Sequence, residues 1–204
     1  FDQFKKIKKY CDLKKIDFIT TPFDNESFNF VFSELNIKTL KIASFDVTNK
    51  KFLNFIFKKK LNFIMSVGMS NLSEINKAVK ILKNNKSNVC LLHCISGYPI
   101  KENESNLSNI NHLKKMFDDL IIGYSDHTNG IKVPVYAVAG GAKIIEKHFK
   151  LKGDNKCADA PVSIDKTQMK QMIFNIKELQ SIKSVPNFKN KIAEKNILKF
   201  RRYS

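Results

Sequence analysis

Short, continuous apolar runs alternate with segments of helical periodicity along most of this chain. Runs without a polar residue at every second position are typical of parallel strands that are buried on both faces. Most runs are followed by apolar residues at the spacing of an amphipathic helix, so the chain repeats a β-α unit. We predict six strands, at residues 17–23, 39–43, 62–66, 88–93, 121–124 and 143–146.

The order of these elements limits the fold class. Strict β-α alternation is compatible with a doubly wound sheet or with a β/α barrel. No GxGxxG or P-loop string occurs, so no nucleotide fingerprint supports the doubly wound sheet. The pattern therefore favours an α/β fold of the TIM (β/α)8 barrel type. Such a barrel typically needs ~250 residues, so we expect an incomplete one with about six of the eight units.

Composition limits the kinds of binding partner that this protein can have. The net charge is +17, with 36 Lys and Arg against 19 Asp and Glu. The lysines are spread over every predicted helix and form no basic-aromatic motif, which argues against a nucleic-acid partner. No apolar run reaches the ~18–20 residues that a membrane span needs. Four cysteines without CxxC pairing indicate reduced thiols, so we expect a cytoplasmic protein with no membrane partner.

Two histidines follow neighbouring predicted strands, His127 after residues 121–124 and His148 after residues 143–146. If the two strands are parallel neighbours, both imidazoles lie at the same rim of the sheet. Imidazoles that converge there suit a divalent metal, and Asp126 could orient one of them. The spacing alone leaves open that both histidines are ordinary polar residues at loop starts.

Other polar residues at the same rim suggest an anionic, phosphorylated substrate. Lys41 stands among apolar neighbours in LKIAS (40–44), and a lysine in a buried strand needs a partner or a function. Asp46, just beyond, could bind substrate hydroxyls or act as an acid or base. Local turn bonds, an exposed edge position for Lys41 and a helix cap for Asp46 are the alternatives. Hydroxyl donors at this rim are Thr21, Ser44, Ser66, Ser96 and Ser125.

Six strings together resemble the sialic acid synthase family, whose members make N-acetylneuraminate and related nonulosonates such as legionaminate and pseudaminate. The resemblance covers about residues 1–183 in the right order. The strings are TTPFD (20–24), KIAS (41–44), SVGM (66–69), LLHCISGYP (91–99), GYSDHT (123–128) and EKHF (146–149).

The resemblance implies a carbon–carbon bond-forming transferase. The family condenses phosphoenolpyruvate with an N-acetylated hexosamine such as N-acetylmannosamine. The phosphoenolpyruvate C3 attacks the open-chain sugar aldehyde, water adds at C2, and phosphate leaves with cleavage of the C–O bond. A divalent metal, Mn²⁺ with Mg²⁺ as the alternative, polarises the aldehyde.

By resemblance, His127 and His148 hold the metal and, with Asp46, form the catalytic group. Tyr98 matches a position near the sugar pocket, and Asp159 an acidic position in the last active-site loop. Phe45-Asp46 stands where the family usually has Gly-Glu, which bears on sugar specificity. The positions that match phosphoenolpyruvate-binding residues are Thr21, Lys41, Ser44, Ser66, Ser96 and Ser125.

The resemblance also implies a domain organisation. The predicted strands correspond to strands three to eight, so residues 1–183 form a partial synthase barrel. Residues 184–204 lead, as a linker, toward a C-terminal antifreeze-like (SAF) domain. We expect a domain-swapped homodimer at full length and no activity from this chain alone. The alternatives are a non-catalytic sugar- or phosphate-binding remnant, or another metal-dependent aldol-type lyase of the same barrel fold.

Overall fold

The computed structural model describes residues 1–84, 87–183 and 192–202. Five strands form one parallel sheet in the order in which they occur along the chain. Each strand pairs with the next, from Thr39↔Asn62 at one edge to Asp126↔Lys147 at the other. The strands are β1 (Thr39–Ile42), β2 (Asn62–Ser66), β3 (Val89–His93), β4 (Ile121–Asp126) and β5 (Ile145–Lys147).

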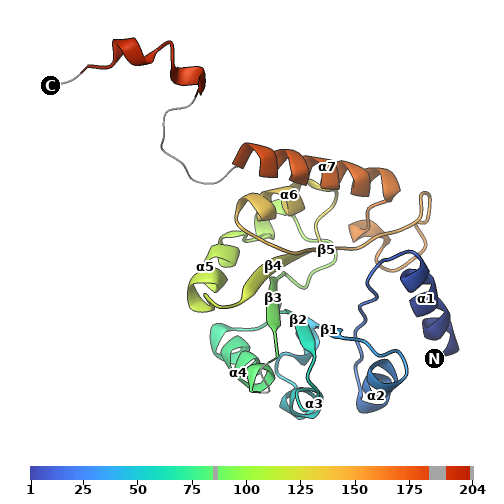
Figure 1. Cartoon of the computed structure of the whole chain (residues 1–204). Coiled ribbons are helices and arrows are strands. Elements are labelled where there is room, and N and C mark those ends of the chain that lie inside the picture. The colour runs from blue at the N-terminus through green and yellow to red at the C-terminus, as the bar shows by residue number, and fades with distance from the viewer. Residues whose placement is uncertain (85–86, 184–191, 203–204) are drawn as a thin grey trace.

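Figure 1 shows the helices on the outside of this curled sheet. The strand order has no reversal, whereas a doubly wound sheet reverses direction at a switch point. The sheet is therefore a half-barrel of the TIM type, and it settles the choice that the β-α alternation had left open. The helices are α1 (Asp2–Leu13), α2 (Asn25–Ser33), α3 (Lys50–Ile56), α4 (Leu72–Lys83), α5 (Ser108–Met116), α6 (Lys132–Ala139) and α7 (Lys166–Lys183).

The helices that follow the strands owe their positions to capping residues and to apolar faces. Helix α4 starts with a capping box, in which Asn71 accepts from the Glu74 N–H and Glu74 accepts from the Asn71 N–H. Its Leu82 is fully buried against the core. Because each such helix packs against the outside of the sheet, the carboxyl ends of the strands remain together at one rim.

The predicted strand at residues 17–23 is wrong. Only Thr20 pairs with the sheet, through an isolated parallel bridge to Leu40 in which the Lys41 N–H donates to the Thr20 carbonyl over 3.1 Å. Two residues later Pro22 has no N–H to donate, and Asp24 already caps α2. The chain therefore touches the edge of β1 once before it turns into a helix.

The described residues at the two ends of the chain bury less apolar surface than those in its middle. Helix α1 has the apolar spacing of a core helix but no fully buried residue. Its exposed apolar side chains include Tyr10 and Leu13, and Phe1 stacks on Phe30 of α2. Of the predicted linker, residues 184–191 and 203–204 lie outside the described residues, and 192–202 contains two short 3₁₀ turns, Ile192–Glu194 and Leu198–Phe200.

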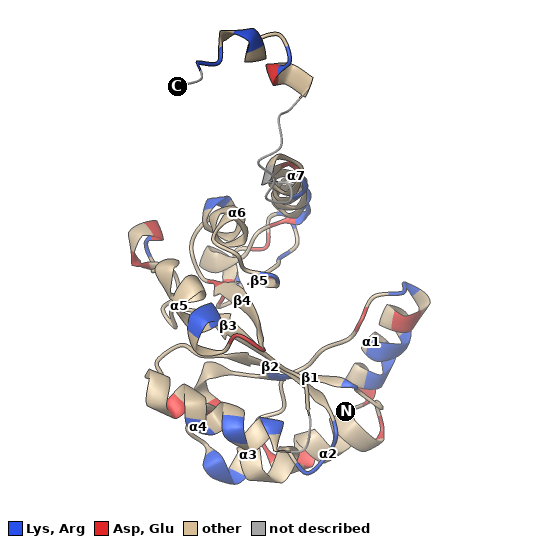
Figure 2. Cartoon of the chain, turned by 60° about the vertical axis from the view of Figure 1, so that its left-hand side comes forward, with Lys and Arg blue, Asp and Glu red and all other residues tan. Residues whose placement is uncertain are grey.

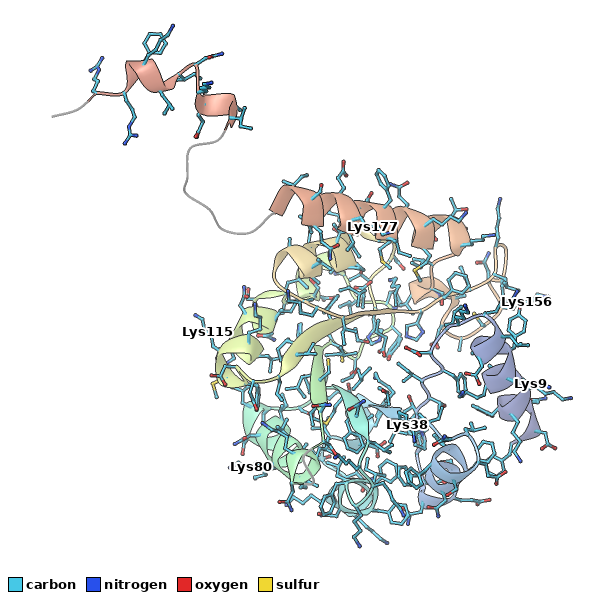
Figure 3. The ribbon with its side chains drawn as sticks, viewed as in Figure 1. Lys9, Lys38, Lys80, Lys115, Lys156 and Lys177 are labelled. Carbon is cyan, nitrogen blue, oxygen red and sulfur yellow. The ribbon has the colours of Figure 1, made fainter. Side chains whose placement is uncertain are left out.

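Charge is distributed over the outer surface. Lys and Arg are spread over the outer helices and loops (Figure 2). The six lysines labelled in Figure 3 come from different helices and loops, and all are exposed. Within the described ranges, no helix is long and apolar enough to cross a membrane.

Candidate active site

A cavity of about 350 Å³ lies at the carboxyl ends of the strands. Its lining combines a cation, several hydroxyls and two imidazoles, drawn from segments more than a hundred residues apart. Nine of the predicted site residues line it: Thr21, Lys41, Ser44, Ser66, Ser96, Tyr98, Ser125, His127 and His148.

Lys41 extends from β1 into a chain of polar contacts across the cavity. Its ammonium donates to Ser66 Oγ over 2.8 Å and lies 3.5 Å from Glu146 Oε2. Ser125 Oγ donates to the other carboxylate oxygen of Glu146 over 2.6 Å. Because one carboxylate links the lysine to Ser125, the contacts hold side chains from β1, β2, β4 and β5 in one constellation.

A close approach of backbone and side chains forms another part of the wall. Gly68 donates its N–H to Ser44 Oγ over 3.0 Å, and Ser44 Oγ lies 3.2 Å from Cys94 Sγ. A Cβ at position 68 would lie 2.3 Å from Ser96 Oγ and 2.8 Å from Cys94 Sγ. Only glycine leaves room for these side chains here.

The two histidines lie side by side, with ring centroids 5.4 Å apart. His127 Nδ1–H donates to the Ile95 carbonyl over 2.7 Å, which leaves Nε2 with its lone pair. Burial lowers the pKa of His127, and the neighbouring His148 charge lowers it further. The neutral imidazole, which is the form that binds metals, is therefore favoured at His127.

Tyr98 covers the histidine pair. Its ring centroid lies 4.0 Å from that of His127 and 5.6 Å from that of His148, where the contact is edge-on. The side chain remains about half exposed. Burial raises the pKa of the phenol, and the nearby Cys94, Asp159 and Glu146 raise it further. Tyr98 is thus a neutral hydroxyl beside the imidazoles.

Asp126 does not orient His127, contrary to the sequence-based interpretation. The Ile95 carbonyl takes that place, while Asp126 Oδ2 accepts from Lys147 Nζ over 2.6 Å. The Thr128 hydroxyl also donates to Asp126, over 2.9 Å. The carboxylate is fully buried and committed to these two partners, so it is unavailable to the imidazole beside it.

Two predicted site residues do not line the cavity. Asp46 is buried in a 3₁₀ turn (Ser44–Asp46), where it accepts from the Asn49 side chain over 2.9 Å. Asn49 in turn caps α3 by accepting from the Phe52 N–H, so Asp46 supports a helix start, which was its structural alternative. Asp159 is largely exposed, and its carboxylate lies 3.4 Å from His148 Nδ1.

Comparisons with known proteins show which family the chain belongs to. The NeuB family model matches residues 1–186. The chain belongs to the NeuB family. N,N'-diacetyllegionaminic acid synthase of Campylobacter jejuni is 41% identical over 168 residues, which are 81% of this chain and 50% of that protein. N-acetylneuraminate-9-phosphate synthase of Mus musculus is 32% identical over 176 residues, 86% of this chain and 49% of that protein.

A solved structure of the same family superposes closely. The N-acetylneuraminic acid synthetase of Leptospira borgpetersenii, in complex with citrate, matches with a TM-score of 0.91 at 35% identity. The match covers 98% of this chain and 70% of that one. This chain spans about half the length of the curated relatives that it matches.

Sequence reasoning assigned no role to three residues that line the cavity of this NeuB-family chain, Cys94, Glu146 and Lys147. All three lie inside the strings that carry the resemblance. For Glu146 a signal was present in the sequence, because it ends the predicted strand at residues 143–146, two residues before His148. Charge alone would not place the negative carboxylate of Glu146 in a site that is predicted to bind an anion. Its contact with the Lys41 ammonium explains why it is there.

The residues present fit a metal held mainly by histidine. Among the described residues, no group of three or more His, Cys, Asp and Glu side chains is arranged to hold a metal ion. The histidine pair supplies two nitrogen donors, and His148 keeps Nε2 available because Nδ1 faces Asp159. Two imidazoles together with oxygen donors from water or substrate suit Mn²⁺ and similar cations.

Proposed function

We propose that this chain is the catalytic barrel portion of a nonulosonate synthase, which condenses phosphoenolpyruvate with an N-acetylated hexosamine and releases phosphate. The observation that carries the proposal is the single cavity in which Lys41, four serine hydroxyls and the histidine pair meet. Membership of the NeuB family supports it, since the relatives named above make sialic and legionaminic acids.

Lys41 and the serines suit phosphoenolpyruvate. This substrate carries a carboxylate and a phosphate, and an ammonium with nearby hydroxyls offsets such charges. Lys41 is held in an extended position by Ser66 and Glu146 and is only 12% exposed. A lysine whose side chain is already ordered loses less entropy when it binds the anion.

The histidine pair suits the sugar aldehyde. His127 and His148 would hold a divalent cation, Mn²⁺ in the first instance, which when bound supplies Lewis acidity toward a carbonyl oxygen. The Ile95 carbonyl fixes the His127 tautomer and ring position. Tyr98, half exposed over both rings, lies where the hexosamine enters and can donate its hydroxyl to the sugar.

In the proposed reaction, the phosphoenolpyruvate C3 attacks the aldehyde carbon and forms the new carbon–carbon bond. Water then adds to the cation at C2, and phosphate departs with cleavage of its C–O bond. Lys41 and the serine hydroxyls hold the phosphate and carboxylate through both steps, so the reacting carbons stay aligned. We also propose that the protein at its full natural length is a homodimer.

The test is phosphate release by the protein at its full natural length. We expect release from phosphoenolpyruvate only when both Mn²⁺ and an N-acetylated hexosamine are present, with a product mass equal to the condensed sugar acid. N-acetylmannosamine and the diacetylated hexosamine precursors of legionaminate and pseudaminate are the substrates to compare. Absence of phosphate release with all of them contradicts the proposal.

A further inference from the structure

Lys147 and Asp126 form an ion pair that is shielded from water. The exposed fractions of the two side chains are 1% and 0%, and the Lys147 ammonium lies 2.6 Å from Asp126 Oδ2. The ammonium also donates to the Thr128 carbonyl over 2.5 Å. The Thr128 hydroxyl donates to both Asp126 oxygens, over 2.9 Å and 3.0 Å. Three hydrogen bonds therefore join the three side chains, and a fourth ties Lys147 to the backbone of Thr128.

The pair occupies a particular place in the chain. Asp126 and Thr128 flank His127 on both sides, and Lys147 directly precedes His148. Asp126 and Lys147 are also the last register partners of β4 and β5, so backbone pairing of these strands ends at this point. Beyond it, the ion pair ties the segment that carries one imidazole to the segment that carries the other.

One other side-chain hydrogen bond joins the same two strands, since Ser125 Oγ donates to Glu146 Oε1 over 2.6 Å one register pair earlier. His127 is held by Ile95, which lies after β3, and His148 faces Asp159, which lies in a later loop. Each of those contacts fixes one ring relative to a third segment. The distance between the rings depends on how the ends of β4 and β5 are held together, and the buried pair is the register pair nearest to the two histidines.

We propose that the Asp126–Lys147 ion pair is a positioning device that sets the spacing of the His127–His148 pair for a divalent cation. The proposal rests on the proposed function, because it assumes that the histidines bind a metal. Buried ion pairs contribute little net stability but can specify register, since only one arrangement satisfies both charges. Partners that orient metal ligands indirectly typically change metal affinity about 10–100-fold when they are removed.

The experiment measures Mn²⁺ affinity in the protein at its full natural length, by electron paramagnetic resonance of free Mn²⁺. The test variant carries Asp126→Asn with Lys147→Met. It keeps side-chain shape and net charge, and its asparagine can still accept from Thr128, so it leaves no unpaired buried charge. Thermal unfolding and circular dichroism establish that it is folded. We expect Mn²⁺ affinity to fall by about tenfold or more while the fold is kept.

A matched control carries Glu102→Gln with Lys132→Met, which removes an exposed lysine–carboxylate ion pair. It should bind Mn²⁺ as the unaltered protein does. Unchanged Mn²⁺ affinity in the folded Asp126→Asn, Lys147→Met variant overturns the positioning role while leaving the proposed function intact. Failure of the unaltered protein to bind Mn²⁺ at all overturns the metal chemistry of the proposed function and the positioning role with it.

Discussion

Lys41 and Lys147 extend from opposite edges of the same sheet, one from β1 and the other from β5, and both border the cavity. Lys147 is 1% exposed and has an ideal carboxylate partner at 2.6 Å. Lys41 is 12% exposed, donates to a serine hydroxyl, and has its carboxylate partner only at 3.5 Å. The Lys147 ammonium therefore has its hydrogen-bond partners within the protein, whereas the Lys41 ammonium can still accept a ligand.

The difference shows how the role of a lysine in a parallel strand can be inferred from the partners of its ammonium. A charge that is removed from water needs full compensation, and when the protein supplies it the residue is structural. A charge that is only partly compensated on a cavity wall is ready to bind an anion. The exposed lysines of Figure 3 belong to neither class, since water solvates them.

The largest effect is expected from Lys147→Met. The substitution leaves the Asp126 carboxylate buried without its counter-ion, so we expect the free energy of unfolding to fall by about 3–5 kcal/mol. Urea titration followed by circular dichroism measures it. Lys132→Met, in an exposed pair with Glu102, serves as the control and should cost less than about 1 kcal/mol. Equal losses in the two variants would contradict the structural interpretation of Lys147.

Lys41→Met should act on activity rather than on stability. We expect phosphoenolpyruvate-dependent phosphate release to fall about 10²–10³-fold, the loss typical of removing one group that stabilises developing or bound negative charge. The unfolding transition should stay nearly unchanged because Glu146 keeps Ser125 as a partner. Lys38→Met removes the same charge from an exposed position just before β1 and should retain activity. Full activity in Lys41→Met would rule out its role as an anion ligand.

Gly68→Ala tests the space around the wall that Ser44, Cys94 and Ser96 form. Its Cβ would meet Ser96 Oγ at 2.3 Å, so we expect a loss of about 1–3 kcal/mol in stability and weaker binding of phosphoenolpyruvate. Gly140→Ala is the control, because its nearest atom would lie 3.4 Å away. Isothermal titration and urea unfolding measure both effects. A Gly68→Ala variant with unaltered affinity would indicate that the wall can move aside.

Much of the site could be predicted because strand ends are visible in the sequence. The polar residues after apolar runs, such as Ser66 and His127, were predicted to meet at one rim, and they line one cavity. Asp46 does not line the cavity because the chain enters a 3₁₀ turn, Ser44–Asp46, shortly after β1, and the side chain of Asp46 is buried there. Asp126 does not orient His127, contrary to the prediction, because the Ile95 carbonyl accepts the hydrogen bond from the imidazole.

The sequence by itself determined the β-α repeat, the positions of nearly all the elements and most of the polar residues at the rim, since these depend on local periodicity and on short strings. The tertiary structure decided the strand order, the loss of the strand at 17–23, and which acids pair with which bases. Partner choice depends on distances between residues far apart in the chain, as between Lys41 and Glu146. Burial then separates the roles of the two lysine–carboxylate pairs. The Lys147–Asp126 pair is shielded from water and fixes the structure around it, whereas the ammonium of Lys41 lies on a cavity wall, where it can meet a ligand.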